Sequence, residues 1–74
     1  MILTDYNKRL GRNLRKVRIA LMLSLADVAT ETVGEFKASV VGAYERGDRA
    51  ITAVRLHDLC EFYCIKPIDV LPDG

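Results

Sequence analysis

The sequence has few of the residues on which several protein classes depend. It contains two cysteines, one histidine and no tryptophan, and no apolar run approaches the roughly 20 residues that a membrane span needs. Cys60 and Cys64 are too few for a disulfide scaffold, which favours a reducing, cytoplasmic location. The first five residues have no basic region ahead of an apolar core, so we expect no secretory signal.

An excess of charge of one sign is also missing. The net charge is only +1 over 74 residues, which by itself argues mildly against nucleic-acid binding. The distribution is uneven, however, because six of the eleven Lys and Arg residues lie between Lys8 and Arg18. Half of the residues are hydrophobic and 28% are charged, which is a globular composition. We therefore expect one small domain that covers residues 1–74.

Residues that support catalysis or metal binding are equally sparse. The lone His57 has no Ser or Cys nucleophile in a motif context, and the chain has no glycine-rich phosphate loop. His57, Cys60 and Cys64 could line one helical face, but a metal site would need further ligands. We expect no enzyme activity, no cofactor and no metal, and we interpret Cys60 as a small buried apolar residue.

Apolar residues recur at helical spacing along most of the chain. The first series is Leu10, Leu14, Val17 and Leu21. It predicts a helix from about Asp5 to Leu21 that is capped by Thr4 or Asp5 and carries a basic face opposite the apolar one. Ser24, with Asp27 three residues later, resembles a capping box and predicts a second helix that runs to about Thr32.

Three more helices are predicted after Gly34, which breaks the pattern. The third runs from about Phe36 to Arg46 and ends at Gly47, a suitable left-handed cap. Thr52 caps the fourth, and Pro67 suits the first position of a short fifth helix. The expected inward residues of the second and third helices are Val28, Val40, Val41 and Tyr44. The fourth helix carries apolar residues at helical spacing, and the fifth contains two more: Leu56, Leu59, Cys60 and Tyr63 in the fourth, and Ile68 and Leu71 in the fifth. Five short helices with tight loops define an all-α bundle.

Residues from about 24 to 46 have the pattern of a helix-turn-helix. Three signatures sharpen it: Leu25-x-x-Val28-Ala29, Val41-x-x-Tyr44-Glu45-Arg46-Gly47 and Thr52-x-x-x-Leu56-x-x-Leu59. Together they resemble the Cro/repressor-like (XRE) family of helix-turn-helix domains, and the run from Phe36 to Ala50 resembles an actinobacterial developmental repressor of this type. The resemblance implies a five-helix domain that binds specific double-stranded DNA and represses transcription.

The resemblance also implies which residues contact DNA. The third helix would lie in the major groove, with its N-terminal residues against base edges. Its expected base-reading residues are Lys37, Ala38, Ser39, Gly42 and Ala43, with Gly42 where the backbone comes closest to DNA. Ser24, Arg46 and Arg49 are expected at phosphates. Because these base-reading side chains are short, indirect readout is expected to carry much of the specificity.

Three structural features complete the prediction. The family pattern implies that Arg18 and Glu45 form a half-buried pair that orients the first helix on the third. The segment from Glu31 to Glu35 is longer than the usual family spacing, which leaves the geometry of the turn open. Cys64 stands where a glycine often closes the fourth helix, at a cost of about 1 kcal/mol if that residue is left-handed.

Two alternatives stay open. The basic face of the first helix could be a DNA-binding surface, but we interpret it as a solvated face of which only the edge reaches phosphate. The same scaffold could also be a protein-binding module that contacts another regulator, a polymerase or a toxin, and the near-neutral charge favours that function. If DNA is the partner, we expect a homodimer at least on DNA, because one such domain reads about one half-site.

Overall fold

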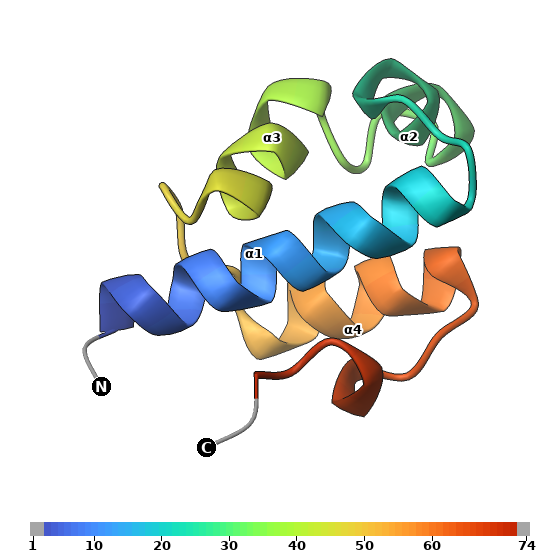
Figure 1. Ribbon diagram of the computed structural model, residues 1–74. Coiled ribbons are helices and arrows are strands. Elements are labelled where there is room, and N and C mark those ends of the chain that lie inside the picture. The colour runs from blue at the N-terminus through green and yellow to red at the C-terminus, as the bar shows by residue number, and fades with distance from the viewer. Residues whose placement is uncertain (1–2, 73–74) are drawn as a thin grey trace.

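A long first helix crosses the middle of the domain, and the later helices lie on two sides of it (Figure 1). The computed structural model describes residues 3–72. The α-helices are α1 (Leu3–Ala20), α2 (Leu25–Glu31), α3 (Ala38–Arg46) and α4 (Ala53–Tyr63), followed by the short 3-10 helix η1 (Pro67–Asp69). Within residues 3–72 there is no strand, and no helix is both long and apolar enough to cross a membrane. The all-α prediction is therefore confirmed.

The prediction of five helices is wrong, because the expected fifth helix is only a three-residue 3-10 turn. Pro67 occupies its first position, and the Val70 amide donates to the Pro67 carbonyl at 3.0 Å. Pro72 disfavours helical backbone at Leu71, so a second turn cannot follow. Val70 is fully buried, whereas Ile68, within the 3-10 turn, is 71% exposed.

The core combines residues from all four α-helices, the α2–α3 turn and the segment after η1. Its buried apolar members are Leu10, Leu14, Val28, Phe36, Val41, Tyr44, Leu56, Leu59, Cys60, Tyr63 and Val70. Leu21 was predicted to continue the apolar series of α1 but is exposed. Met22 takes a left-handed conformation (φ 61°), and the Leu23 amide donates to the Arg18 carbonyl at 3.1 Å. This arrangement ends α1 at Ala20 and turns Leu21 outward.

Helices α1 and α3 meet through backbone contact at Gly11. A Cβ atom added at Gly11 would lie 2.4 Å from the Tyr44 carbonyl oxygen, so only glycine fits there. At the other end of the same interface, Gly47 closes α3 in the left-handed conformation (φ 76°), as predicted. A Cβ at Gly47 would meet Lys8 of α1 at 2.6 Å. These two glycines fix how closely α3 lies against α1.

Candidate nucleic-acid interface

Helix α2 starts at a reciprocal cap that the sequence predicts. The Asp27 amide donates to Ser24 Oγ at 2.9 Å, and the Ser24 amide donates to Asp27 Oδ2 at 2.8 Å. Hydrogen bonding from the Ser24 backbone amide, and then from the Ser24 side chain, holds the pKa of the Asp27 carboxyl below its usual value. The N-terminus of α2 is thus well defined and already carries a negative charge.

The turn between α2 and α3 is anchored by a buried aromatic ring. Val33 and Gly34 both adopt left-handed backbone conformations, with φ of 54° and 77°. The chain then returns to the core at Phe36, whose amide donates to Thr32 Oγ1 at 3.2 Å. Because Phe36 belongs to the turn and Lys37 is the N-cap, α3 begins at Ala38, two residues later than predicted.

Arg55 of α4 holds this turn from the other side and was not predicted. Its Nη2 donates to the Glu35 carbonyl oxygen at 2.7 Å, and its Nη1 lies 3.8 Å from Glu35 Oε1. Its guanidinium carbon lies 4.0 Å from the centroid of the Phe36 ring, which is a cation–π contact. Arg55 is 20 residues from Glu35, so no local sequence signal connects them.

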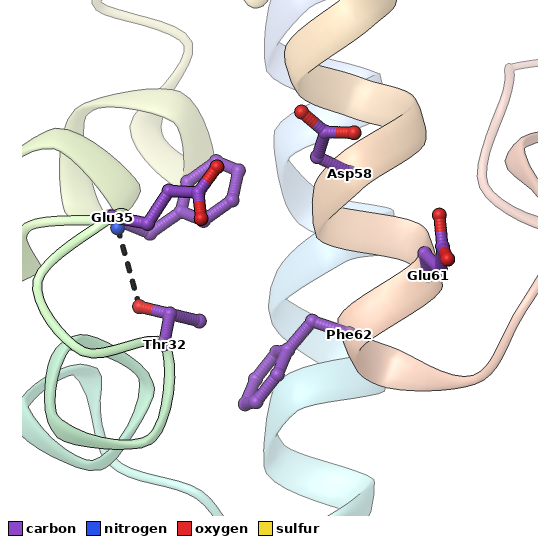
Figure 2. Close-up of a pocket in the computed structure, with 6 residues that line it drawn as sticks. Thr32, Glu35, Asp58, Glu61 and Phe62 are labelled. Carbon is purple, nitrogen blue, oxygen red and sulfur yellow. Dashed lines mark hydrogen bonds between the residues drawn. The ribbon is translucent and has the colours of Figure 1, made fainter.

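A hollow of about 370 Å³ separates the turn from α4 next to this clamp. Figure 2 shows its lining, with Thr32 and Glu35 on the turn and three side chains facing them from α4: Asp58, Glu61 and Phe62. Three of the lining side chains are carboxylates. This side of the turn is therefore acidic, and it is not a surface that would attract a phosphate.

Arg18 and Glu45 form a two-pronged pair between α1 and α3. Arg18 Nε donates to Glu45 Oε2 at 2.7 Å, and Arg18 Nη2 donates to Glu45 Oε1 at 3.0 Å. The third guanidinium nitrogen donates to the Leu23 carbonyl oxygen at 2.7 Å. The two side chains are only 10% and 5% exposed, and the carboxylate raises the pKa of Arg18. One guanidinium therefore joins α1, the α1–α2 turn and α3.

The outward face of α3 carries mostly short side chains. Helical positions 38, 39, 42, 43 and 46 fall within an arc of about 140° at 100° per residue. Ser39 is exposed, and Ala38 and Ala43 are partly exposed on this arc, while Val41, Tyr44 and Glu45 are buried on the other side. Lys37 is exposed at the N-cap. Because its side chains are short, this face of α3 lets the helix backbone approach another surface closely.

Gly42 lies on this arc but is buried, and packing accounts for it. A Cβ at Gly42 would lie 3.4 Å from Leu25 Cδ1 and 3.1 Å from Arg46 Nη1. The glycine therefore lets α3 pack against Leu25 and lets the Arg46 side chain fold back along α3. Its predicted close approach to DNA requires the Arg46 side chain to move away first.

The three residues predicted at phosphates are all exposed, but their surroundings differ. Ser24 has its hydroxyl and amide engaged with Asp27. Arg46 Nε donates to Asp48 Oδ2 at 2.9 Å in an exposed pair. Arg49 lines a hollow of about 450 Å³, and two further cations line the same hollow, Lys37 and Arg55. This hollow therefore carries three cations and one carboxylate, that of Glu35, which lies beside Arg55.

The side chains considered as metal ligands, those of His57, Cys60 and Cys64, do not share one environment. Cys60 is fully buried, and burial raises the pKa of its thiol, whereas His57 and Cys64 are exposed. His57 instead lies 3.6 Å from Asp58 and 3.7 Å from Glu61 on the surface of α4. Cys60 thus has the buried, apolar role predicted for it.

Two short helices joined by a turn, with the second presenting an open face, are the arrangement expected of a helix-turn-helix domain. The fold is similar to the crystal structure of the DNA-binding domain of BldD, with a TM-score of 0.91 and 46% identity over 93% of this chain and 97% of that one. It is also similar to the S. venezulae BldD DNA-binding domain, with a TM-score of 0.89 and 47% identity over 92% and 99% of the two chains.

The chain therefore belongs to the family of BldD DNA-binding domains. This confirms the narrower resemblance predicted from the run between Phe36 and Ala50, while membership of the wider XRE family stays a prediction. No family model matches the sequence, and no curated protein matches it either.

Proposed function

We propose that the chain is a sequence-specific DNA-binding transcriptional regulator that reads the major groove with α3. The observation that carries this proposal is its 46% identity to a DNA-binding domain, over 97% of that domain's length. The exposed face of α3 supports it further, because short side chains let a helix lie deep in a groove. Both similar structures are DNA-binding domains and not enzymes, which favours a function in binding and not in catalysis.

On this proposal α3 supplies few but specific base contacts. Lys37 lies at the N-terminal end of the helix, where base edges are within reach of a long donor. Ser39 can donate or accept a hydrogen bond, and Ala38 and Ala43 can touch thymine methyl groups. Because these contacts distinguish few bases, the shape and deformability of the operator supply the remaining specificity. Occupation of the operator would block transcription, so we propose a repressor.

The phosphate contacts are proposed to flank this helix. Arg46 and Arg49 follow α3 at its C-terminal side, and Ser24 stands at the start of α2. Because Ser24 is next to the Asp27 carboxylate, we expect the two arginines to contribute more of the affinity than Ser24 does. Contact with Arg46 would compete with its exposed pair to Asp48, which costs little to break.

We also propose that two copies bind one operator. A single recognition helix fills one stretch of major groove, so one domain reads about one half-site. The segments that could join the copies are the α3–α4 loop, the end of α4 and residues 65–71. A single half-site would give modest affinity against the non-specific excess of a genome.

The experiment that tests the proposed function is a salt titration of binding to fluorescent genomic duplexes. DNA binding should weaken steeply with salt, because phosphate contacts release counterions. Arg49→Ala should weaken binding to all sequences alike and reduce the salt slope by about one unit. Arg12→Ala, on the outer face of α1, is the matched control and should leave the slope nearly unchanged. Affinity that is absent, or independent of salt, would contradict the proposal.

A further inference from the structure

The outer face of α1 carries two adjoining hollows that the proposed function does not use. One is about 390 Å³ and is lined by α1 alone, with Ile19 and Ala20 at its base. The other is about 420 Å³ and lies between α1 and the segment formed by η1 and the residues after it, where Ile68 and the Asp69 carboxylate contribute to the wall. The hollows share Arg12 and Lys16, so they form one continuous surface, which we call the outer α1 surface.

The outer α1 surface combines unpaired cations with exposed apolar groups. Within residues 3–72, the side chains of Arg12, Arg15 and Lys16 make no ion pair and no hydrogen bond. Their aliphatic stems line the apolar hollow, and their charged ends are left to solvent. Ile19 is 50% exposed and Ile68 is 71% exposed. A surface of this kind offers both charge and apolar area to one partner.

This surface adjoins the side of α1 that holds α3 and continues around the helix. Gly11 marks the α3 side, because it contacts the backbone of α3 at Tyr44. At 100° per residue, the angles from Gly11 around the helix are about 40° for Arg15, 80° for Ile19, 100° for Arg12 and 140° for Lys16. No residue that lines the outer α1 surface belongs to the α3 face, so the surface can be occupied while α3 is engaged.

We propose that the outer α1 surface docks an acidic amphipathic helix of a protein partner. Carboxylates of such a helix would meet Arg12, Arg15 and Lys16, and its apolar side chains would enter the hollows beside Ile19 and Ile68. From Arg12 to Ala20 the surface extends about 12 Å along α1, which matches two turns of a partner helix.

The mixture of groups favours this partner over other anions. A phosphodiester backbone has no apolar side chain to cover Ile19, and a lipid surface needs a much broader apolar face than one isoleucine in each hollow. This inference goes beyond the proposed function and does not depend on it, because the docking residues are not those of the α3 face.

The test uses a synthetic peptide of about 14 residues with glutamates on one helical face and leucines on the other. Titrated into the isotope-labelled chain, it should bind saturably with a Kd of about 0.1–1 mM. The shifted amides should lie in α1 and in residues 68–72. A double change, Arg12→Gln with Lys16→Gln, should weaken peptide binding about tenfold.

Matched controls separate this inference from the proposed function. Arg49→Gln removes one cation from the α3 side and should leave peptide binding unchanged, while it weakens binding to DNA. The Arg12/Lys16 double variant should show the opposite pattern. No saturable binding, equal binding of a peptide with the same residues scrambled, or shifts centred on α3 would each overturn the inference. Binding to anionic phospholipid vesicles with the same double-variant sensitivity, and none to the peptide, would overturn it as well.

Discussion

At the scale of single residues, Arg18 shows how one side chain can set the orientation of two helices. Its guanidinium uses three nitrogens, two on Glu45 and one on the Leu23 carbonyl. Burying such a pair costs desolvation, so its main effect is to select one arrangement of α1 and α3. Removal of one partner has a larger effect, because it leaves the other charge buried alone.

Glu45→Ala should therefore lower the free energy of unfolding by about 3 kcal/mol. Glu61→Ala is the control, because that carboxylate is exposed on α4 and its loss should change stability by no more than about 0.5 kcal/mol. Chemical denaturation of the two variants measures the difference. An unchanged unfolding midpoint for Glu45→Ala would mean that the pair does not hold the helices.

A second residue-scale prediction concerns the end of α4. Cys64 is the C-cap in a left-handed conformation (φ 61°), which was the condition for the strain expected from the sequence. Cys64→Gly should stabilise the domain by about 1 kcal/mol, because glycine adopts this conformation without a Cβ penalty. Cys64→Ala keeps the Cβ atom and should give no gain in thermal unfolding. Equal stability of the two variants would contradict the strain.

The long-range pair predicted from the sequence had a family pattern behind it, whereas the contacts that were missed had none. Glu45 was identified because it follows a core tyrosine in a family pattern, and the structure places Arg18 against it. Arg55 was missed, because its partners Glu35 and Phe36 belong to a turn that only the folded chain brings to α4. Gly42 was interpreted through DNA alone, because its contact with Leu25 depends on the crossing of two helices.

At the scale of elements, the helix ends that depend on a local capping signal were predicted, and two other boundaries were not. Ser24 and Thr52 cap their helices with side-chain hydrogen bonds, and Gly47 ends α3, because all three signals act within four residues. The start of α3 and the fifth helix were wrong for different reasons. Burial of Phe36 in the turn delays the start of α3, and burial is not visible in local spacing. The fifth helix stops after one turn because Pro72 disfavours helical backbone at Leu71.

The turn between α2 and α3 leads directly into α3 and is held by Arg55 of α4. Arg55→Ala removes its hydrogen bond, its ion pair and its ring contact at once, so stability should fall by about 1–2 kcal/mol. Hydrogen exchange of amides in residues 33–39 should accelerate more than that in α1. Arg55→Lys keeps the charge but not the planar stacking, and should restore little of the loss.

His57→Ala is the control for the Arg55 variants. It removes an exposed side chain from the same helix and touches only surface carboxylates. Its exchange pattern should match that of the unaltered chain. If Arg55→Ala were to leave exchange in residues 33–39 unchanged, the clamp would have no part in holding the turn.

At the scale of the whole molecule, the number of copies that bind one operator depends on how much DNA one α3 face can read. One domain is 35 Å in its longest dimension, which is about one helical turn of DNA, so neighbouring half-sites can each hold a copy. Insertion of five base pairs between half-sites would rotate one copy to the opposite face of the duplex. Cooperative binding of the second copy, measured by titration, should then disappear; cooperativity that survives the insertion would contradict the paired arrangement.

The most direct test of the central claim is selection of bound sequences from a random duplex pool. A domain that reads the major groove through α3 should enrich a consensus made of two related half-sites, about one helical turn apart. The same selection with Lys37→Ala and Ser39→Ala together should relax the consensus at the contacted positions and keep the half-site spacing. A pool that shows no enrichment after repeated rounds, while the chain remains folded, would contradict the account.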